Sequence, residues 1–326
     1  MVIGPPGRVL VTGATGGLGR TLVPALVAEG HAVRATGRNR TIGDALTGVD
    51  FIAADLAEED LSPLVRDVEI VFHLAARSSP WGSDALFEAV NVVATRRLLD
   101  AARAAGCRRF VFASTPSVFA EPRDRLALTE ESPVASPFAS AYARTKYEAE
   151  RLVLAADSEA MRAVALRPRA IVGPHDTVLL PRLLRIARRG ALPLPRGGAA
   201  LIEISDVRDV ARAFIAAARS EKACGRAINI SGGQPRPVRD IALAACKALG
   251  VPCRIRSVPV GLLMAGAGIL EGLGRIVGRE PPVTRYSAMT LAWSQTFDLS
   301  GAAALLDWRP RHSTEDAIVH AATGLA

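Results

Sequence analysis

Short apolar runs alternate with longer amphipathic segments along the first half of the chain. The runs have the length of buried strands, and they are Arg8–Thr12, His31–Thr36, Phe51–Ala54, Glu69–Leu74, Arg109–Ala113 and Ala163–Arg167. The segments between them include three with the period of an amphipathic helix: Gly17–Glu29, a stretch from an N-cap at Ser83 to about Ala105, and Ser140–Ala155. This alternation predicts an α/β fold with a doubly wound parallel sheet.

The alternation loosens after Pro168, where Gly173-Pro174 and Pro193–Gly198 indicate loops. Helix and strand candidates then follow at Val207–Ala218, Ala227–Ser231, Val238–Leu249 and Arg254–Val258. We therefore expect two domains, residues 1–170 and residues 171–326. The second is expected to be smaller and mostly helical, to close over the carboxyl edge of the sheet, and to return some segments to the first.

One stretch of the second half is almost uninterrupted apolar sequence. Val258–Leu270 is 13 residues long, and Glu271 and Arg275 follow it. A bilayer-spanning helix needs about 18 apolar residues. The stretch therefore predicts a buried or interfacial helix, with peripheral membrane contact through residues 258–277 as the alternative.

The composition is that of a globular protein, with 49% hydrophobic and 22% charged residues. The net charge of +8 raises the question of a nucleic-acid partner. However, the basic residues are spread along the chain without a basic block, only three are lysine, and aromatic residues make up only 5%. The charge pattern therefore indicates an arginine-rich composition and no nucleic-acid partner.

The four cysteines show neither a CxxC spacing nor a nearby histidine pattern: Cys107, Cys224, Cys246 and Cys253. They predict neither a metal site nor a redox pair. The N-terminal residues lack the basic and apolar regions of a signal peptide. We therefore expect a reducing, cytoplasmic setting.

Glycines at positions 13, 16 and 19 stand directly after the first strand and open the first helix. Glycine permits a tight turn and a close approach of backbone to phosphate, and the helix N-terminus attracts an anion. The spacing is GxxGxxG, which differs from the GxGxxG of the usual dinucleotide fingerprint. Its place between strand and helix nevertheless predicts a pyrophosphate-binding turn.

The end of the second strand indicates which dinucleotide is bound. NAD sites carry an acidic residue about 20 positions after the turn, whereas this chain has Thr36, Gly37 and Arg38. A guanidinium suits a 2′-phosphate. NADP is therefore the expected cofactor, with NAD as the alternative.

Tyr142 and Lys146 are four residues apart on a predicted helix and so share one face. With three tyrosines and three lysines in the whole chain, such a pair is rare by chance. A phenol titrates near 10 and is a poor base at neutral pH. We expect the Lys146 ammonium and the positive nicotinamide of an oxidised cofactor to lower the pKa of Tyr142.

Taken together, these motifs resemble the extended short-chain dehydrogenase/reductase family, whose first domain is a Rossmann fold. The matching segments span nearly the whole chain: Thr12–Gly19, Asp55-Leu56, His73–Ala76, Ser114–Ser117, Tyr142–Lys146, Arg167-Pro168, Gly173-Pro174 and Phe297–Ser300. The resemblance implies an NAD(P)-dependent oxidoreductase.

The resemblance also implies a role for each matching residue. Thr115, Tyr142 and Lys146 would be catalytic, with Ser117 as the alternative to Thr115, and Lys146 would also bind the nicotinamide ribose. The expected cofactor contacts are Gly13, Thr15, Gly16, Gly17, Leu18 and Gly19 in the turn, Arg38, Asp55 and Leu56 near the adenosine, and Leu74, Ala75, Ala76 and Pro168 along the dinucleotide. Asn91 would brace the centre from its helix.

Departures from the family pattern indicate the branch. Epimerases and dehydratases of nucleotide sugars usually carry VYG after the active-site Ser/Thr, whereas this chain has Val118-Phe119-Ala120. Their diphosphate-binding Arg would fall near Leu201–Ile204, which is apolar and acidic here. The second half therefore resembles the 3β-hydroxysteroid dehydrogenase-like branch, including reductases of 2-alkyl-3-ketoacids.

We expect hydride transfer between nicotinamide and a small hydrophobic hydroxy or keto substrate, in a homodimer. Two alternatives remain open. The first is a nucleotide-sugar epimerase or dehydratase with a retained NAD. The second is a non-catalytic dinucleotide sensor, although such proteins often lose the Tyr or the Lys.

Overall fold

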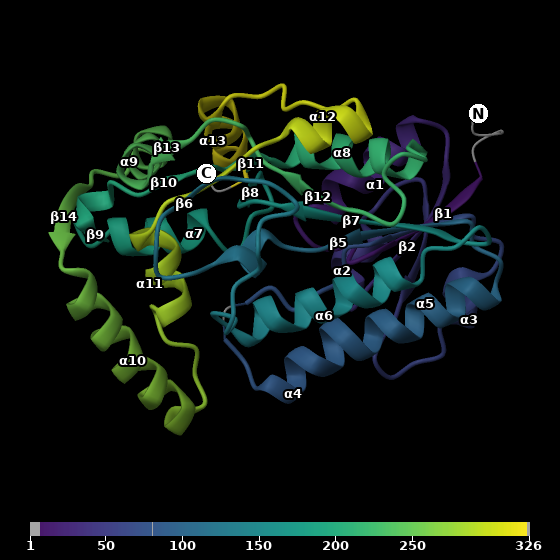
Figure 1. The fold of residues 1–326 in the computed structure, drawn as a ribbon, viewed down its shortest axis with the longest axis horizontal. Helices are drawn as coiled ribbons and strands as arrows, with labels where there is room; N and C mark the ends of the chain where they lie inside the picture. The colour runs from purple at the N-terminus through teal and green to yellow at the C-terminus, as the bar shows by residue number, and fades with distance from the viewer. Residues whose placement is uncertain (1–6, 80, 325–326) are drawn as a thin grey trace.

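A parallel sheet of seven strands lies at the centre of the protein (Figure 1). The structure is a computed structural model, and it describes residues 7–79 and 81–324. From one edge to the other the strands are β12 (Ala227–Ile230), β7 (Arg162–Pro168), β5 (Arg109–Ala113), β4 (Ile70–His73), β1 (Arg8–Thr12), β2 (Ala32–Gly37) and β3 (Val49–Ala53). All neighbours pair in parallel. The predicted doubly wound parallel sheet is thereby confirmed.

Helices cover both faces of this sheet (Figure 1). One face carries α1 (Gly19–Ala28), α8 (Val207–Arg219) and α12 (Ser300–Leu306), and the other carries α3 (Ser62–Val65), α5 (Ala94–Ala104) and α6 (Ala141–Ala155). Leu22 and Phe214 are fully buried in the first layer, and Leu98 and Val153 in the second. The short helix α2 (Arg40–Asp44) lies between β2 and β3 in the chain.

The predicted helix from Ser83 to Ala105 contains a widened turn. Ser83 is its N-cap, and its side chain accepts a hydrogen bond from the backbone N–H of Leu86. The helix then runs through α4 (Asp84–Phe87), the π-helical segment η1 (Glu88–Val93) and α5. π-helical turns occur frequently at functional sites, and this one carries the buried Asn91.

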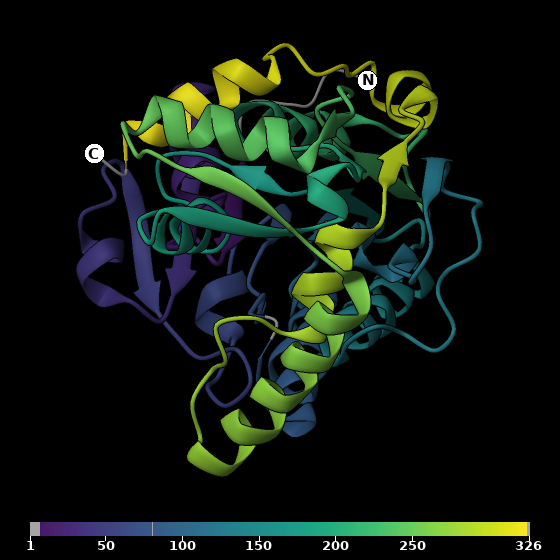
Figure 2. The same ribbon diagram turned by 90° about the vertical axis from the view of Figure 1, so that its left-hand side faces the viewer.

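The second half forms helices joined by short strand pairs beside the carboxyl edge of the sheet (Figure 2). The pairs are β8 (Ile171–Val172) with β11 (Ser205–Asp206), β9 (Ala191–Pro195) with β14 (Arg254–Val258), β10 (Leu201–Ile202) with β13 (Arg236–Pro237), and β6 (Arg125–Leu128) with β15 (Gln295–Phe297). The helices are α7 (Leu180–Ala187), α9 (Val238–Ala248), α10 (Val260–Val277), α11 (Arg285–Ala292) and α13 (Thr314–Ala322), with the 3₁₀ turn η3 (Arg196–Gly198). Strand β6 and the 3₁₀ turn η2 (Pro116–Phe119) come from the first half of the chain, after β5. The helical C-terminal portion is confirmed, while a boundary at residue 170 stays a prediction.

The apolar helix is longer than the sequence pattern indicated. α10 has 18 residues and is, within residues 7–79 and 81–324, the one helix long and apolar enough to cross a membrane by length and composition. The prediction of 13 residues was too short because Glu271 and Arg275 lie inside the helix. The Glu271 carboxylate accepts a hydrogen bond of 2.7 Å from the backbone N–H of Arg285 at the start of α11, and the Arg275 side chain is exposed.

Candidate active site

A cavity of about 770 Å³ opens at the carboxyl ends of the central strands. Strands β1 and β4 are neighbours there, although the chain passes through β2 and β3 between them. Such a change of direction in the strand order is where doubly wound sheets bind ligands. One arm of the cavity follows the glycine turn, and the other is walled by the second half of the chain.

The glycine turn is closely packed against the sheet. Gly13 has a φ of +66°, and a Cβ there would lie 2.7 Å from the backbone nitrogen of Ala75. A Cβ on Gly19 would collide with the carbonyl oxygen of Gly13. Only glycine fits at these two positions, so they let the turn pack closely while its residues line the cavity at the N-terminus of α1. This is the geometry that accepts a phosphate anion.

The predicted cofactor contacts line the cavity with one exception. Those that line it are Gly13, Thr15, Gly16, Gly17, Leu18, Gly19, Arg38, Asp55, Leu56, Leu74, Ala75, Ala76, Tyr142, Lys146 and Pro168. These residues fit a dinucleotide, because the glycine turn, the exposed Arg38 guanidinium and the Tyr–Lys pair all line a single cavity.

Asn91 is the exception, because it lies buried behind the cavity wall. Its Oδ1 accepts a hydrogen bond of 2.9 Å from the backbone N–H of Arg77, and its Nδ2 donates one of 3.1 Å to Thr145. Thr145 precedes Lys146 on α6. Asn91 therefore ties the π-helical turn to the helix that carries the Tyr–Lys pair.

Arg38 follows the end of β2, at the edge of the cavity. Its side chain is 68% exposed, and Nη1 lies 3.9 Å from Oδ2 of Asp55. Asp55 follows β3 and accepts a hydrogen bond of 2.9 Å from the backbone N–H of Ala57. The guanidinium is therefore available to an anion at the end of the second strand.

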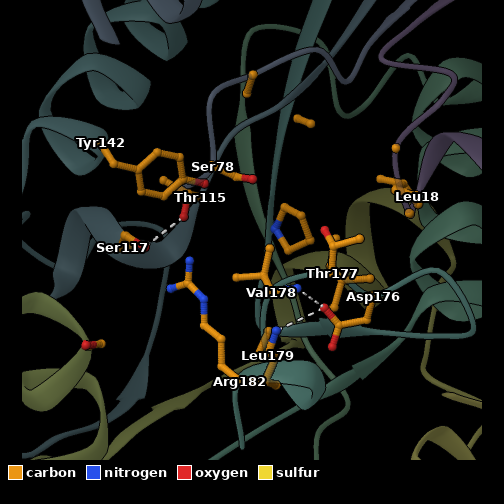
Figure 3. A pocket seen from close by; sticks show the side chains of 18 of the residues that line it. Leu18, Ser78, Thr115, Ser117, Tyr142, Asp176, Thr177, Val178, Leu179 and Arg182 are labelled. Atoms are coloured by element: carbon orange, nitrogen blue, oxygen red, sulfur yellow. Dashed lines mark hydrogen bonds between the residues drawn. The ribbon is translucent and has the colours of Figure 1, made fainter. Parts of the chain in front are cut away.

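Tyr142 and Lys146 lie on the first turns of α6 and both line the cavity. Ser140 caps the helix by accepting a hydrogen bond of 3.2 Å from the Ala143 N–H. Figure 3 shows the Tyr142 ring directed toward Thr115. Thr115 follows β5, and its hydroxyl donates a hydrogen bond of 2.9 Å to Ser117. The structure thus brings the three predicted catalytic residues together.

Burial controls the charge of this pair. It lowers the pKa of Lys146 to about 7, against a smaller opposing effect of the Glu150 carboxylate. It also raises the pKa of Tyr142 to about 12, although hydrogen bonding to Thr115 opposes this. In the protein without a cofactor, the pKa of Tyr142 is therefore raised, whereas we expect a lowered pKa beside Lys146 and a bound oxidised nicotinamide. The reason is that desolvation of the buried phenol outweighs its hydrogen bonding to Thr115.

His73 adds no charge to the site. It is buried, and desolvation together with the nearby Lys146 lowers its pKa to about 3. Its ring nitrogens lie 2.7 Å from the Thr12 hydroxyl and 2.9 Å from the Thr95 hydroxyl. A neutral His73 therefore connects β1 to α5 below the cavity floor.

Several cavity residues were missed by sequence reasoning. The Tyr286 hydroxyl lies 2.5 Å from Ser117 Oγ, and Arg169 also lines the cavity. Figure 3 places Val178, Leu179 and Arg182 in the same space. Arg169 directly follows the Arg167-Pro168 motif and could have been noticed. Tyr286 carries no local signal, because α11 reaches the site only through the tertiary fold.

The second arm of the cavity is largely apolar. Its walls include Leu183, Ile186, Leu192, Ile202, Leu263 and Leu291. Near Ile202, Glu203 is buried and accepts hydrogen bonds from the Ser231 hydroxyl and the Phe297 N–H. The segment Leu201–Ile204 contains no arginine. However, Arg169 and Arg182 supply positive charge elsewhere in the cavity wall.

Comparison with known proteins decides the family. Residues 9–231 match the model of the NAD dependent epimerase/dehydratase family. The chain belongs to this family. It is 34% identical to a 2-alkyl-3-oxoalkanoate reductase of Stenotrophomonas maltophilia (strain K279a) over 95% of this chain and 97% of the relative.

A human relative and a solved structure extend the comparison. The chain is 32% identical to the human sterol-4-alpha-carboxylate 3-dehydrogenase, decarboxylating, over 71% of this chain and 63% of the relative. These relatives confirm the 3β-hydroxysteroid dehydrogenase-like branch of the extended short-chain dehydrogenases/reductases. The solved structure of MoeE5 in complex with UDP-glucuronic acid and NAD is 24% identical, with a TM-score of 0.78 over 98% of this chain and 99% of that chain, which supports the fold.

Proposed function

We propose that the protein is an NAD(P)-dependent oxidoreductase that interconverts a ketone and a secondary alcohol on a hydrophobic substrate. One observation carries this proposal: Tyr142 and Thr115 line the same cavity as the glycine turn and the apolar side chains of the second half of the chain. A substrate carbonyl in this cavity can receive hydrogen bonds from both hydroxyls, while its hydrocarbon part packs among the side chains of the second half of the chain.

Each catalytic residue has a distinct task. When bound, the reduced dinucleotide supplies the hydride that adds to the carbonyl carbon and is itself oxidised. Thr115 holds the carbonyl oxygen, and Tyr142 gives it a proton as the carbon is reduced, so that a secondary alcohol forms. Lys146 binds the ribose next to the nicotinamide and stabilises the phenolate that remains. Solvent then restores the proton to Tyr142.

NADP is the proposed dinucleotide. Arg38 supports it, because its guanidinium is exposed after the end of β2 and a cation there can pair with a 2′-phosphate. Asp55 follows the next strand, β3, and its Oδ2 lies 3.9 Å from Nη1 of Arg38. NAD binding would instead use Asp55 or backbone groups for the ribose hydroxyls.

A substrate screen tests the reaction. The purified protein is incubated with NADPH or NADH and with steroid ketones, 3-oxo acids and aryl ketones, and absorbance of the reduced cofactor is followed. We expect stoichiometric oxidation of NADPH with at least one hydrophobic ketone. Binding of NADPH without turnover of any ketone would contradict the proposal and favour dinucleotide sensing.

A nucleotide-sugar epimerase is the second candidate. Arg169 and Arg182 favour it, because a diphosphate needs cationic partners. The same screen therefore includes UDP-glucose and UDP-glucuronic acid, with analysis of the products by NMR. Epimerisation without net consumption of NADPH, together with a dinucleotide that co-purifies, would identify this activity.

We also propose that α10 rests on an anionic membrane surface. Leu262, Ile269, Leu273 and Ile276 follow helical spacing along one exposed face, and Ile276 is 83% exposed. The opposite face packs against the protein, where a Cβ on Gly274 would lie 3.2 Å from Trp81. The exposed cations near the ends of the helix are Arg254, Arg256, Arg275 and Arg279. A single exposed apolar face flanked by arginines suits an interfacial helix.

Liposome co-sedimentation tests this surface. We expect binding to vesicles with phosphatidylglycerol, weaker binding to neutral vesicles, and loss of binding when Leu262, Ile269, Leu273 and Ile276 are changed to serine. The control changes the exposed Leu243 and Val319 to serine and should retain binding. Unchanged sedimentation of the variant with four serines would contradict membrane contact through α10. Conversion of a dimer to monomers by the same four substitutions would also contradict it, because the apolar face would then be a subunit interface.

A homodimer in the cytoplasm completes the proposal. Leu86 and Val93 are exposed apolar side chains on the helices next to α6, and they support self-association through that layer. All four cysteines are unpaired, which supports a reducing compartment. Light scattering coupled to gel filtration would show a dimer, and Leu86→Glu with Val93→Glu should yield monomers.

A further inference from the structure

Two of the four cysteines lie in contact at the end of α9. Cys246 is in the last turn of this helix and is only 3% exposed, whereas Cys253 directly precedes β14 and is half-buried. Both side chains pack in one apolar cluster, and the Cys246 thiol donates a hydrogen bond to the Cys253 sulfur. Both cysteines are reduced in the structure. Six residues separate them in the sequence, so the fold, and not a CxxC spacing, creates the contact.

Backbone hydrogen bonds hold the turn between the two cysteines. The Val251 N–H donates to the Cys246 carbonyl at 2.9 Å, and Gly250 before it has a φ of +65°. This pattern ends a helix and turns the chain back toward its last turn. After Cys253, the Arg254 N–H donates at 3.3 Å to the carbonyl of the residue before β9, where β14 begins to pair with β9. Cys253 is therefore fixed from both sides beside Cys246.

The two thiols differ in their chemistry. Burial, the hydrogen bond to Cys253 and the charge that Cys253 carries when ionised raise the pKa of Cys246 to about 12. Cys246 therefore remains a protonated thiol at neutral pH. Cys253 is the more exposed of the two and is the one that a dissolved reagent can reach. In the described part of the chain, neither belongs to a group of three His, Cys, Asp or Glu side chains suited to a metal ion. The pair thus offers one accessible and one shielded thiol in contact.

We propose that Cys246 and Cys253 form a reversible disulfide, with a small disulfide such as glutathione disulfide as the oxidant. The Cys253 thiolate attacks one sulfur of the oxidant, which forms a mixed disulfide and releases one glutathione. The Cys246 sulfur then attacks the Cys253 sulfur, forms the internal disulfide and releases the second glutathione, which takes the Cys246 proton. Two protein thiols are oxidised, and one glutathione disulfide is reduced to two thiols. Neither dinucleotide nor substrate takes part, so this chemistry is independent of the proposed oxidoreductase reaction.

Removal of the charge on Cys253 assists the second step. An ionised Cys253 disfavours ionisation of Cys246, and this repulsion ends when Cys253 becomes a mixed disulfide. The hydrogen bond between the thiols already places the attacking sulfur next to its target. Attack by a neighbouring group is favoured over attack by a second molecule from solution. The internal disulfide should therefore replace the mixed disulfide.

The disulfide would join two elements beside the apolar arm of the cavity. Ala242, one turn before Cys246 on α9, lines the cavity, and so does Leu192 of β9, which pairs with Ile255 of β14. A cross-link between α9 and the start of β14 therefore restrains the substrate side of the cavity. It also closes a loop of eight residues in the unfolded chain, which stabilises the folded state.

Peptide mapping without reductant tests the disulfide. The purified protein is equilibrated with glutathione buffers in which the disulfide fraction rises, and free thiols are then alkylated before digestion with trypsin. Cleavage after Arg239, Lys247 and Arg254 places the two cysteines in separate peptides, Asp240–Lys247 and Ala248–Arg254. We expect these peptides to become linked, with loss of two hydrogens, and to separate again on reduction. The oxidised protein should melt about 3 °C higher than the reduced protein.

Single substitutions distinguish the roles of the two thiols. Cys246→Ser should leave Cys253 as a stable mixed disulfide with glutathione, because the displacing thiol is missing. Cys253→Ser should leave Cys246 reduced. Cys224→Ser provides the matched control, because Cys224 is also half-buried but contacts the Arg109 guanidinium. This control should form the linked peptides to the same extent as the wild type.

Two results would overturn the proposed disulfide. One is a wild-type chain whose two peptides stay unlinked in the most oxidising buffer, with Cys253 either reduced or held as a mixed disulfide. The other is linkage of Cys246 or Cys253 to Cys107 or Cys224 as often as to each other, which would show scrambling in unfolded chains. Both results come from the wild-type chain, so a variant that fails to fold does not affect the outcome. The measurement also needs no turnover, so it stands whether or not the proposed reaction is found.

Discussion

The ammonium of Lys146 lies 4.0 Å from the centroid of the Phe112 ring, inside the second helical layer of the sheet. A cation over an aromatic face gains some electrostatic stabilisation, but here burial dominates and lowers the pKa of Lys146 to about 7. Lysine at this position therefore reduces the stability of the cofactor-free protein.

This predicts an unusual dependence of stability on pH. The pKa of Lys146 falls from 10.5 to about 7 on folding, so between these values the folded state binds fewer protons than the unfolded chain, and stability rises with pH. The substitution Lys146→Met removes the free-energy cost of burying the ammonium or deprotonating it. We expect its free energy of unfolding to exceed that of the wild type by about 2 kcal/mol at pH 6, with the difference narrowing toward pH 10. Urea unfolding at several pH values measures this, and a less stable variant at pH 6 would contradict it.

Tyr142→Phe should abolish turnover while cofactor affinity stays within a few-fold. The substitution removes only the hydroxyl that exchanges a proton with the substrate, and the ring keeps its packing against the cavity wall. Fluorescence titration with NADPH and steady-state rates separate the two effects. Wild-type turnover in this variant would remove Tyr142 from the mechanism.

The two hydroxyls after β5 should differ in importance. Thr115→Val removes a donor aimed at the substrate oxygen and should lower kcat by about 10²- to 10³-fold. Ser117→Ala breaks the contact with Tyr286 and should lower kcat less than about tenfold. Measuring both variants with one substrate decides between the residues, and the reverse ranking would make Ser117 the catalytic hydroxyl.

Arg38→Ala should weaken NADPH binding about 30-fold or more and leave NADH binding within about threefold, since a charged hydrogen bond to the 2′-phosphate is lost. Arg40→Ala, two residues along, provides the control. Binding titrations with both dinucleotides measure the ratio. Equal losses for NADPH and NADH would place Arg38 away from the 2′-phosphate.

The Rossmann half of the chain was predictable because its signals are local. Each strand is an apolar run, Gly13 and Gly19 mark a turn that tolerates no side chain, and Tyr142 with Lys146 follows helical spacing. Tyr286 and the short strand pairs of the second half were not predictable, because tertiary contacts alone position them. The raised pKa of Tyr142 in the cofactor-free protein was not predictable either, since the sequence shows neighbouring charges but not the depth of burial.

The π-helical turn illustrates the same limit. The apolar pattern from Ser83 to Ala105 predicts one helix, and the structure has one continuous helical stretch with a wider turn at Glu88–Val93. Only the contacts of Asn91 with Thr145 and Arg77 show what this turn positions.

Strand β12 has a practical consequence for dissecting the protein. It joins the edge of the large sheet beside β7, although it comes from residues 227–230 of the second half. A fragment of the protein that ends at residue 170 would lack β12 and leave β7 with an unpaired edge. Such an edge promotes strand pairing between molecules and precipitation. Chimaeras that exchange substrate specificity between relatives must therefore graft loops and helices around β12 and α8, and keep those two elements with the nucleotide-binding half.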